Sequence, residues 1–439
     1  MKTEETKKEK RARLSWYFYD FGNSAYASIV LLAIFSTYFK NVVVGGVDGT
    51  RLWGLAVGIA AIVVAVISPV LGTIADFTKG KKKFLFFFTS LAVVFTVLLF
   101  FVRQGDVVLG IVFFTIAEIG YRAGQVFYDA LLDDVSTPEN IGAISGTGWA
   151  VGMLGGIVSL VVVMIPMQLM DNFFVPIAFI IAAVFFMLSS IPTFLWVKES
   201  ASPESIPEGE TVIGHGFKNL FATFKDARNY KEFIKYMISY LIYNDGIMML
   251  MDFAAIIGGT LFGLDQTSLI VLVLILHVTG AIGALIFGKV ADKSSGKQAI
   301  LISLLILALS IIGIFFIPYE LPIWFYVASG VAGFALSAAQ AVSRSIVVQL
   351  APADKITEFN GFLSTAGRTS TFIGPLVFSA LSFRMNNWYV NAGYAANIAE
   401  RMGMMWGMGA IVAFLAVGGL LLAFVKKIHI EHVEQEADN

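Results

Sequence analysis

A ten-residue segment that begins at Gly72 returns 216 positions later, beginning at Gly288, and each copy ends a long apolar stretch. The two copies share the pattern Gly-x-x-Ala-Asp-x-x-x-Gly-Lys. A second pattern repeats at an offset of 219 residues, with identical spacing in both places: Gly142, Ser145, Gly148 and Gly155, then Gly361, Ser364, Gly367 and Gly374. Two independent matches at nearly one offset indicate a duplicated chain.

The composition of this chain indicates that most of it is surrounded by lipid. Of its 439 residues, 57% are hydrophobic and 14% are charged, and the mean hydropathy is +0.80. Crossing about 30 Å of hydrocarbon takes roughly 20 apolar residues in a helix, and a helix satisfies its own backbone polar groups in lipid. We therefore predict an all-α integral membrane protein with twelve transmembrane helices: 15–40, 51–74, 84–103, 107–134, 141–166, 173–197, 233–258, 268–290, 299–317, 323–349, 359–384 and 402–425. The repeat divides them into two six-helix halves related by a pseudo-two-fold axis, as in secondary transporters.

The predicted organisation has five parts: a cytoplasmic leader (1–14), an N-terminal bundle (15–197), a cytoplasmic linker (198–232), a C-terminal bundle (233–425) and a cytoplasmic tail (426–439). Within the linker, four apolar residues recur at helical spacing: Phe217, Leu220, Phe221 and Phe224. They predict either a short helix on the membrane surface or an ordinary helix in a cytosolic loop.

Lys and Arg are distributed unequally between the loops. With the N-terminus inside, 22 of the 30 basic residues lie in cytoplasmic segments and five lie in outer loops. This asymmetry follows the positive-inside rule and predicts that both termini are cytoplasmic. The first 14 residues are charged and lack a signal-peptide core, so we expect the first helix to remain uncleaved.

Several protein classes are excluded by what the sequence lacks. There is no Cys, which removes disulfides, thiolate metal sites and Cys nucleophiles. The sequence has no Gly-x-x-x-x-Gly-Lys-[Ser/Thr] loop for nucleotide phosphates, no His-Glu-x-x-His motif and no clear catalytic triad. We therefore expect neither an enzyme nor an ATP-driven pump, no cofactor, no metal site and no nucleic-acid partner.

Small residues mark where helices approach one another closely. They recur every four residues in the fifth and eighth predicted helices: Gly148, Gly152 and Gly156, then Gly280, Ala284 and Gly288. Such stripes let backbones touch in lipid, and we expect the two helices to face each other between the halves. The alternative is that Gly is simply common in membrane helices.

Charged residues inside the predicted helices indicate a polar path. A charge at the bilayer centre costs at least about 2.5–3.5 kcal/mol and normally faces a cavity or a partner. Glu118 and Arg122 lie four residues apart and could pair along one helix face, as a structural bridge or as part of a binding site. Further charged residues inside the helices are Asp20, Asp129, Asp245, Asp252, Arg344 and Arg368. For Asp20 and Asp245, a fixed interhelical hydrogen bond is the alternative.

His277 is the single His inside a predicted helix. An imidazole could relay protons near neutral pH, whereas the alternative is a packed side chain.

The repeated loop pattern resembles the signature of the major facilitator superfamily. More narrowly, five segments resemble the vacuole-effluxer-like family, which includes autophagy-related vacuolar amino-acid effluxers and bacterial relatives: Trp16–Tyr26, Val126–Ala130, Ser145–Gly156, Tyr243–Gly246 and Gln340–Ser345. Asp129 departs from the pattern, because Asn is expected at its position.

The resemblance implies a major facilitator fold and assigns roles to named residues. The gating loops would comprise Gly72, Asp76, Gly80 and Lys81, and Gly288, Asp292, Gly296 and Lys297. Asp76 would meet the start of the eleventh helix, and Asp292 the start of the fifth. Helices one, four, seven and ten would line a central cavity, and the substrate or coupling-ion candidates are Asp20, Asn23, Glu118, Arg122, Asp129, Asn244, Asp245, Arg344 and Arg368. As an alternative, the loops only set topology.

The resemblance also implies a function, namely export of amino acids or related small polar solutes by alternating access. A guanidinium and a carboxylate could together bind a zwitterion, and a buried carboxylate could carry a coupling proton. We expect a monomer in a bacterial plasma membrane. A lipid or amphiphile transporter and a solute-sensing receptor remain as alternatives.

Overall fold

The computed structural model describes most of both predicted bundles. The described residues are 6–77, 80–137, 140–170, 175–199, 230–293, 295–350 and 371–426, with the isolated positions 211, 214, 218 and 367. The predicted surface helix of the linker, at 217–224, therefore lies almost entirely outside the described residues. Every regular element in the described ranges is helical, which confirms the all-α prediction.

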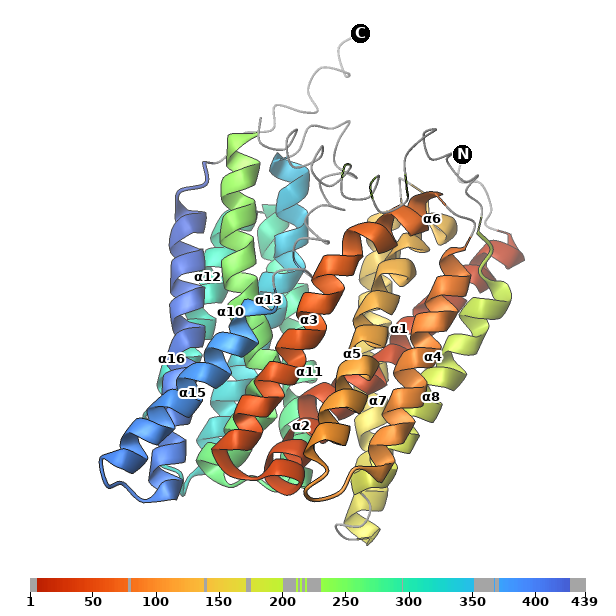
Figure 1. Ribbon diagram of the computed structural model, residues 1–439. Helices are drawn as coiled ribbons and strands as arrows, with labels where there is room; N and C mark the ends of the chain where they lie inside the picture. The colour runs from red at the N-terminus through yellow and green to blue at the C-terminus, as the bar shows by residue number, and fades with distance from the viewer. Residues whose placement is uncertain are drawn as a thin grey trace.

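The first half of the chain folds into a bundle of long helices (Figure 1). Its elements are α1 (Lys7–Tyr26), η1 (Ala27–Ala33), α2 (Phe35–Tyr38), η2 (Phe39–Val44), α3 (Gly46–Phe77), α4 (Lys81–Leu98), η3 (Leu99–Phe101), α5 (Val107–Ala130), α6 (Leu132–Val135), α7 (Ile141–Met170) and α8 (Val175–Trp196). The second half supplies α10 (Lys231–Phe262), α11 (Gln266–Lys293), α12 (Gly296–Ile314), α13 (Pro322–Leu350), α15 (Ile373–Asn391) and α16 (Ala396–Ala423).

Eleven helices within the described ranges are long and apolar enough to cross a membrane. They correspond to all the predicted spans except the eleventh. That span was predicted at 359–384, and α15 describes its second part from Ile373 onward, while 359–366 and 368–370 lie outside the described residues. In Figure 1 the start of α1 and the end of α16 lie at one end of the bundle, called here the terminal end, and the opposite end is called the distal end.

The first span is not a uniform α-helix. Thr6 begins it with a capping box, in which its hydroxyl accepts from the backbone N–H of Glu9 and the Glu9 carboxylate accepts from the backbone N–H of Thr6. Two π-helical stretches, η1 and η2, then interrupt the helix on either side of α2. Because π turns are rare and are frequently found at functional sites, this irregularity makes helix one a candidate for a functional role.

The glycine stripe of α7 packs mainly within its own half. A methyl group added at Gly152 would lie 2.6 Å from the Asp20 carboxylate of α1, and one at Gly148 would lie 2.5 Å from the Trp16 ring. Only Gly156 of this stripe also faces the other half, where it lies against His277 of α11.

The α11 stripe likewise differs from the expectation. Gly280 faces Ser337 of α13, within the C-terminal half, and an added methyl group at Gly288 would meet nothing within 4 Å. Among the described residues, Gly288 therefore makes no close helix contact, which differs from the packing role predicted for it. The helices α7 and α11 do lie against each other, but the glycines serve chiefly the helix pairs inside each half.

The two halves are joined by polar contacts near the distal end. Lys40 forms an ion pair with Glu400 at 2.7 Å, and the Lys40 side chain is 6% exposed. Gln266 donates to the Ala33 carbonyl and accepts from the Thr37 hydroxyl, at 2.6 and 3.0 Å. These contacts hold helix one against the second half at its distal end.

A second set of contacts runs along α3. Its Trp53 indole donates to the Asp252 carbonyl at 2.9 Å, and the Arg51 guanidinium lies 4.4 Å from the centre of the Phe383 ring. α3 also packs along α15 over several turns, as the crossing of these two helices in Figure 1 shows. The halves therefore meet over a broad surface on this side.

We predict that Gly155→Ala destabilises the protein. The new Cβ would collide with the backbone carbonyl of Phe21, which can move only with helix one. Overpacking of this kind costs about 1–3 kcal/mol, so thermal unfolding in detergent should occur at a lower temperature. Gly146 lies on the same helix, and a Cβ added there would have no described atom within 4 Å. Gly146→Ala is therefore the matched control. Equal melting temperatures for both variants would contradict this account of the α1–α7 contact.

Candidate functional site

A buried ion pair lies where the two halves meet. Glu118 and Arg122 sit one turn apart on α5, and the guanidinium Nε contacts Glu118 Oε1, as their spacing predicted. Glu118 is fully buried. Arg122 Nη1 also donates to the Thr371 hydroxyl at 3.3 Å, so the pair reaches from the first half to the residues that precede α15.

Asp252 of α10 joins this pair from the other half. It is 6% exposed and interacts electrostatically with both Glu118 and Arg122. Its backbone carbonyl is held by the Trp53 indole of α3. The sequence identified Asp252 as a charged residue but gave no reason to place it in the site, because periodicity does not show which face of α10 meets α5.

Tyr26 of α1 completes the first-half side of this cluster. Its ring stacks on Tyr121 with centroids 4.8 Å apart, and its hydroxyl faces Glu118 without making a hydrogen bond of normal geometry. We call Tyr26, Glu118, Arg122, Asp252 and Thr371 the interface cluster. The cluster brings together α1, α5 and α10 with the start of the α15 region.

Asn244 and Asp245 lie nearer the terminal end of α10 and tie it to neighbouring helices. Asp245 Oδ2 accepts from the Gly374 backbone N–H at 2.9 Å. Asn244 donates to the Gly367 carbonyl at 3.2 Å and accepts from Gln340 at 2.8 Å. The bond of Asp245 to Gly374 is an interhelical hydrogen bond of the kind that was the alternative to a substrate role for Asp245. Asp245 Oδ1 has no hydrogen-bond partner in the described structure.

Asp20 and Asn23 lie on α1, outside the interface cluster. Asn23 donates to Asp20 Oδ1 at 3.3 Å, and Asp20 packs beside Gly152 of α7. Asp20 also interacts electrostatically with Tyr128 of α5. The structure thus places these two candidates among helices of the N-terminal half.

Three candidates remain: Asp129, Arg344 and Arg368. Asp129 is half-buried in the last turn of α5. Arg344 belongs to α13, but its side chain is outside the described structure, and Arg368 lies outside the described residues altogether.

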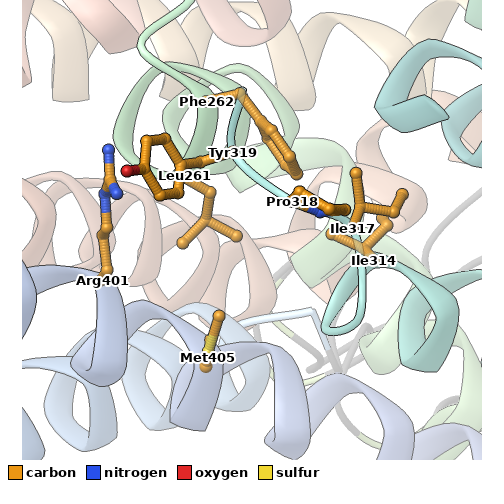
Figure 2. A pocket seen from close by; sticks show the side chains of 8 residues that line it. All are labelled: Leu261, Phe262, Ile314, Ile317, Pro318, Tyr319, Arg401 and Met405. Carbon is orange, nitrogen blue, oxygen red and sulfur yellow. The ribbon is translucent and has the colours of Figure 1, made fainter. Parts of the chain in front are cut away.

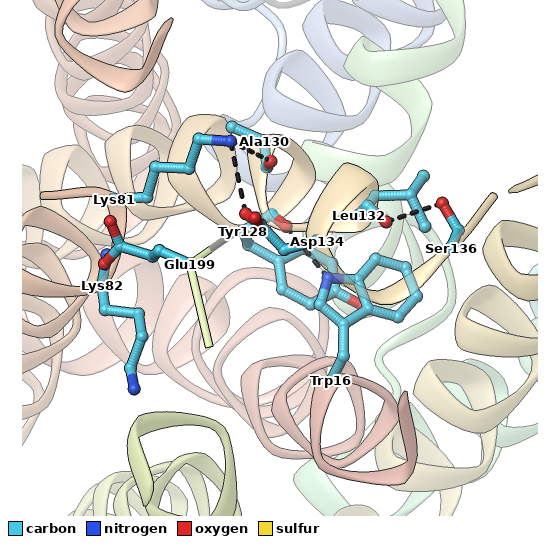
Figure 3. Close-up of polar contacts among 9 residues, drawn as sticks. All are labelled: Trp16, Lys81, Lys82, Tyr128, Ala130, Leu132, Asp134, Ser136 and Glu199. Carbon is cyan, nitrogen blue, oxygen red and sulfur yellow. Dashed lines mark hydrogen bonds and ion pairs between the residues drawn. The ribbon is translucent and has the colours of Figure 1, made fainter. Parts of the chain in front are cut away.

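The first copy of the repeated loop contacts helix ends through its lysines. Figure 3 shows Lys81 reaching the Ala130 carbonyl at 3.0 Å and the Asp134 carboxylate at 3.3 Å. Cations favour helix C-termini because the carbonyl ends carry partial negative charge, and Ala130 ends α5. Burial raises the pKa of the neighbouring Asp133, while Lys81 opposes that shift. Gly80 lies at the N-cap of α4.

The second copy of the loop also contacts a helix end, but through a lysine at a different position of the repeat. Lys297 donates to the carbonyls of Ala423, the last residue of α16, and of Val425, just beyond it, at 2.7 and 2.5 Å. In the first half, Lys82 makes the corresponding contact, with the Val197 carbonyl at 2.6 Å.

The sequence repeat aligns Lys297 with Lys81, but the contacts pair it with Lys82. Gly296 packs against Ile346 of α13. Gly72, Asp76 and Asp292 lie in helices, but the side chains of Asp76 and Asp292 and the surroundings of Gly72 are outside the described structure. The carboxylate contacts predicted for Asp76 and Asp292 therefore lie outside it as well.

His277 contacts both its own helix and the other half. Its Nδ1 bonds the Val273 carbonyl at 2.9 Å, and its Nε2 lies 3.4 Å from the Ser28 hydroxyl of η1. A polar contact between halves therefore forms at one of the π-helical stretches.

An apolar cavity of about 130 Å³ lies at the distal end of the second half. It is lined by Leu261, Phe262, Ile314, Ile317, Pro318, Tyr319, Arg401 and Met405. Figure 2 shows Arg401 beside the Tyr319 ring, at a distance of 4.7 Å between the guanidinium carbon and the ring centre. None of the predicted site residues lines this cavity, and it is separate from the interface cluster.

Two relatives cover much of the chain. This chain is 29% identical over 378 residues to the MFS-type transporter YxiO of Bacillus subtilis (strain 168). The aligned region covers 83% of this chain and 86% of the relative. The chain is 25% identical over 307 residues to Autophagy-related protein 22 of Yarrowia lipolytica (strain CLIB 122 / E 150). That match covers 61% of this chain and half of the longer fungal protein.

Solved transporter structures share the fold. A bacterial homologue of the human lysosomal transporter Spinster, in an inward-facing and unoccupied conformation, superposes with a TM-score of 0.71 at 14% identity, covering 95% of this chain and 97% of that one. A mutant of the nucleoside transporter NupG gives the same TM-score at 13% identity, with 93% and 99% covered. Both confirm the predicted transporter architecture.

The family match spans most of the molecule. The sequence model of the family described as "Vacuole effluxer Atg22 like" matches residues 47–395. This range contains most of each half, both copies of the repeated loop and all of the interface cluster except Tyr26. The chain is an integral membrane transporter of the MFS type and belongs to the Atg22-like vacuole effluxer family.

Proposed function

We propose that the protein is a secondary active transporter that exports amino acids or related small polar solutes by alternating access. The observation that carries the proposal is the interface cluster, in which Glu118, Arg122 and Asp252 bring buried charge from both halves to one place. Buried charges are costly in a membrane and normally serve a substrate or ion path. A proton gradient is the proposed energy source, because buried carboxylates can bind and release protons.

The proposed orientation follows the distribution of basic residues, with both termini in the cytoplasm of a bacterium and the protein a monomer in its plasma membrane. The distal end then faces outward. The described polar contacts between the halves lie at the distal end and at mid-height, which supports a conformation that is closed toward the outside. The Spinster homologue with the same fold was solved facing inward.

The charged cluster favours a polar solute over a lipid. A lipid carrier needs an apolar surface along its path, whereas the described interface between the halves contains two carboxylates and a guanidinium at its centre. The apolar cavity beside Arg401 lies inside one half and therefore offers no route between the two.

The test is transport by the purified protein in liposomes that contain a pH-sensitive dye. With an imposed proton gradient, amino acids, dipeptides and nucleosides are added one at a time; nucleosides are included because NupG, a structural neighbour, is a nucleoside transporter. Proton flux that depends on one compound class would support the proposal. A parallel counterflow assay with radiolabelled compounds detects transport without protons. Absence of both signals for every compound, with folded protein, would overturn the proposal.

We predict that Arg122→Lys reduces transport at least about tenfold while the protein remains folded. Lys keeps the charge, but it cannot contact Glu118 and Thr371 together with a planar fork of donors. Loss of one hydrogen bond to a charged group costs about 1.5–3 kcal/mol, and about 1.4 kcal/mol corresponds to tenfold. Initial transport rates are the measurement. Arg103→Lys, in the connection before α5, is the control and should keep the full rate.

We predict that Lys40→Ala shifts the conformational equilibrium toward an open distal end. The substitution removes the ion pair with Glu400 and leaves that carboxylate without its cation. The chain has no native Cys, so spin labels at Gln104→Cys and Ala395→Cys, exposed in distal loops of the two halves, report their separation by double electron–electron resonance. The distance distribution should gain a longer component. An unchanged distribution would show that the ion pair does not hold the distal end closed.

A further inference from the structure

The hydrogen-bonding capacity of the cluster is not fully used. Glu118 Oε2 and Asp252 Oδ2 have no hydrogen-bond partner within the described part of the chain. Their side chains belong to residues that are 0% and 6% exposed. A buried polar atom without a partner costs free energy and calls for an explanation, such as a ligand that is not part of the chain.

The unpartnered carboxylate atoms can only accept when they are ionised. Asp245 Oδ1, on the same helix as Asp252 and in electrostatic contact with it, is a third such atom. The one described guanidinium in this group, Arg122, is already engaged by Glu118 and Thr371. Among the described side chains, carboxylates therefore outnumber cations, and the free positions favour a ligand that donates hydrogen bonds and carries positive charge.

A metal ion fits these residues poorly. Within the described residues, no group of three His, Cys, Asp or Glu side chains is gathered closely enough to hold one.

A ligand carboxylate also fits poorly. It would have to displace Glu118 from Arg122, since no other described cation lies in the cluster. An ammonium group meets neither obstacle, because it brings its own charge and up to three N–H donors.

We propose that the interface cluster binds the ammonium group of the transported solute through Glu118 and Asp252, and that it does not require the solute to carry a carboxylate. This inference rests on the proposed transport function and specifies which part of the solute the site recognises. Asp252 is thereby a binding residue, although sequence analysis did not include it among the site candidates.

The position of the two carboxylates links binding to closure. Glu118 comes from α5 of the first half and Asp252 from α10 of the second. Glu118 is paired with Arg122, so the two carboxylates and one guanidinium leave one negative charge in excess. An ammonium held by both carboxylates neutralises that excess, and desolvated charges left unpaired are strongly unfavourable. A bound cation therefore stabilises the arrangement in which α5 and α10 approach each other.

The test measures thermal stabilisation of the full-length protein in detergent at neutral pH. The probes are methylammonium, the amides of alanine and leucine (ammonium without carboxylate), and their N-acetyl derivatives (carboxylate without ammonium). The amides and methylammonium should raise the melting temperature in a saturable way, while the N-acetyl derivatives leave it unchanged. Stabilisation by the N-acetyl derivatives alone, or by none of the probes, would overturn the proposal.

Two variants locate the site. Glu118→Gln and Asp252→Asn should each weaken the apparent affinity for the amides at least tenfold, and Asp252→Asn provides the result if Glu118→Gln fails to fold. Asp48→Asn, which neutralises an exposed carboxylate at the start of α3, should bind as the unaltered chain does. Equal affinity in Asp252→Asn and Asp48→Asn would remove Asp252 from the site.

Additional measurements separate this proposal from its rivals. If acidification without any amine stabilises the protein as much as an amine does, the occupant is a proton and the ammonium proposal fails. If N-acetyl derivatives are transported in counterflow, the transport function stands but ammonium recognition is wrong. If amines bind but no compound is transported, the proposed function fails while the ammonium site remains.

Discussion

A charge inside a membrane has to find its partner within the protein, and in this chain that requirement determines where the two halves meet. Glu118 and Arg122 satisfy each other along α5, and Arg122 then reaches Thr371 across the interface. Asp252 of α10 interacts electrostatically with both Glu118 and Arg122. The hydrocarbon around the bundle makes separation of these groups expensive unless water or a ligand replaces the lost contacts. The cluster is therefore both an adhesive between the halves and the place where a solute can compete.

The helix ends follow a related requirement. Terminal carbonyls that no longer bond within a helix need a donor, and the loop lysines supply it at the terminal end of each half. Lys82 bonds Val197, and Lys297 bonds Ala423 and Val425. Each lysine lies at the start of the third helix of its half and contacts the end of the sixth, so each half is closed into a unit by its own loop. Units of this kind can move as rigid bodies.

Much of the fold could be predicted from the sequence, because membrane helices are specified by length and hydropathy alone. The pairing of Glu118 with Arg122 could also be predicted, because a spacing of four residues places two side chains on one helix face. Partners on different helices could not be found in this way. Asp252 and Thr371 join the cluster only through the rotation and packing of α10 and the α15 region.

The repeat was informative about architecture and misleading about individual contacts. It aligned Lys297 with Lys81, whereas the contact of Lys297 is reproduced by Lys82. The spacing of small residues was likewise misleading at Gly288, where a packing role was predicted but an added Cβ would meet no described atom within 4 Å. Duplicated sequences diverge at single positions while the helices keep their places, because packing tolerates a shift of one residue at a helix end more readily than inside the bundle.

The halves also differ in their first helices, and this difference has a mechanical consequence. α10 is one continuous α-helix of 32 residues, whereas its counterpart carries two π-helical stretches, and Ser28 and Ala33, which contact the second half, lie in the first of them. A π turn holds an extra residue, so shifting it along the helix or converting it to an α turn rotates the segment beyond it by roughly 100° per residue. α10 therefore rotates as a single rod. In helix one, by contrast, the part beyond a π-helical stretch can turn separately from α1, so its contacts with the second half can break one at a time.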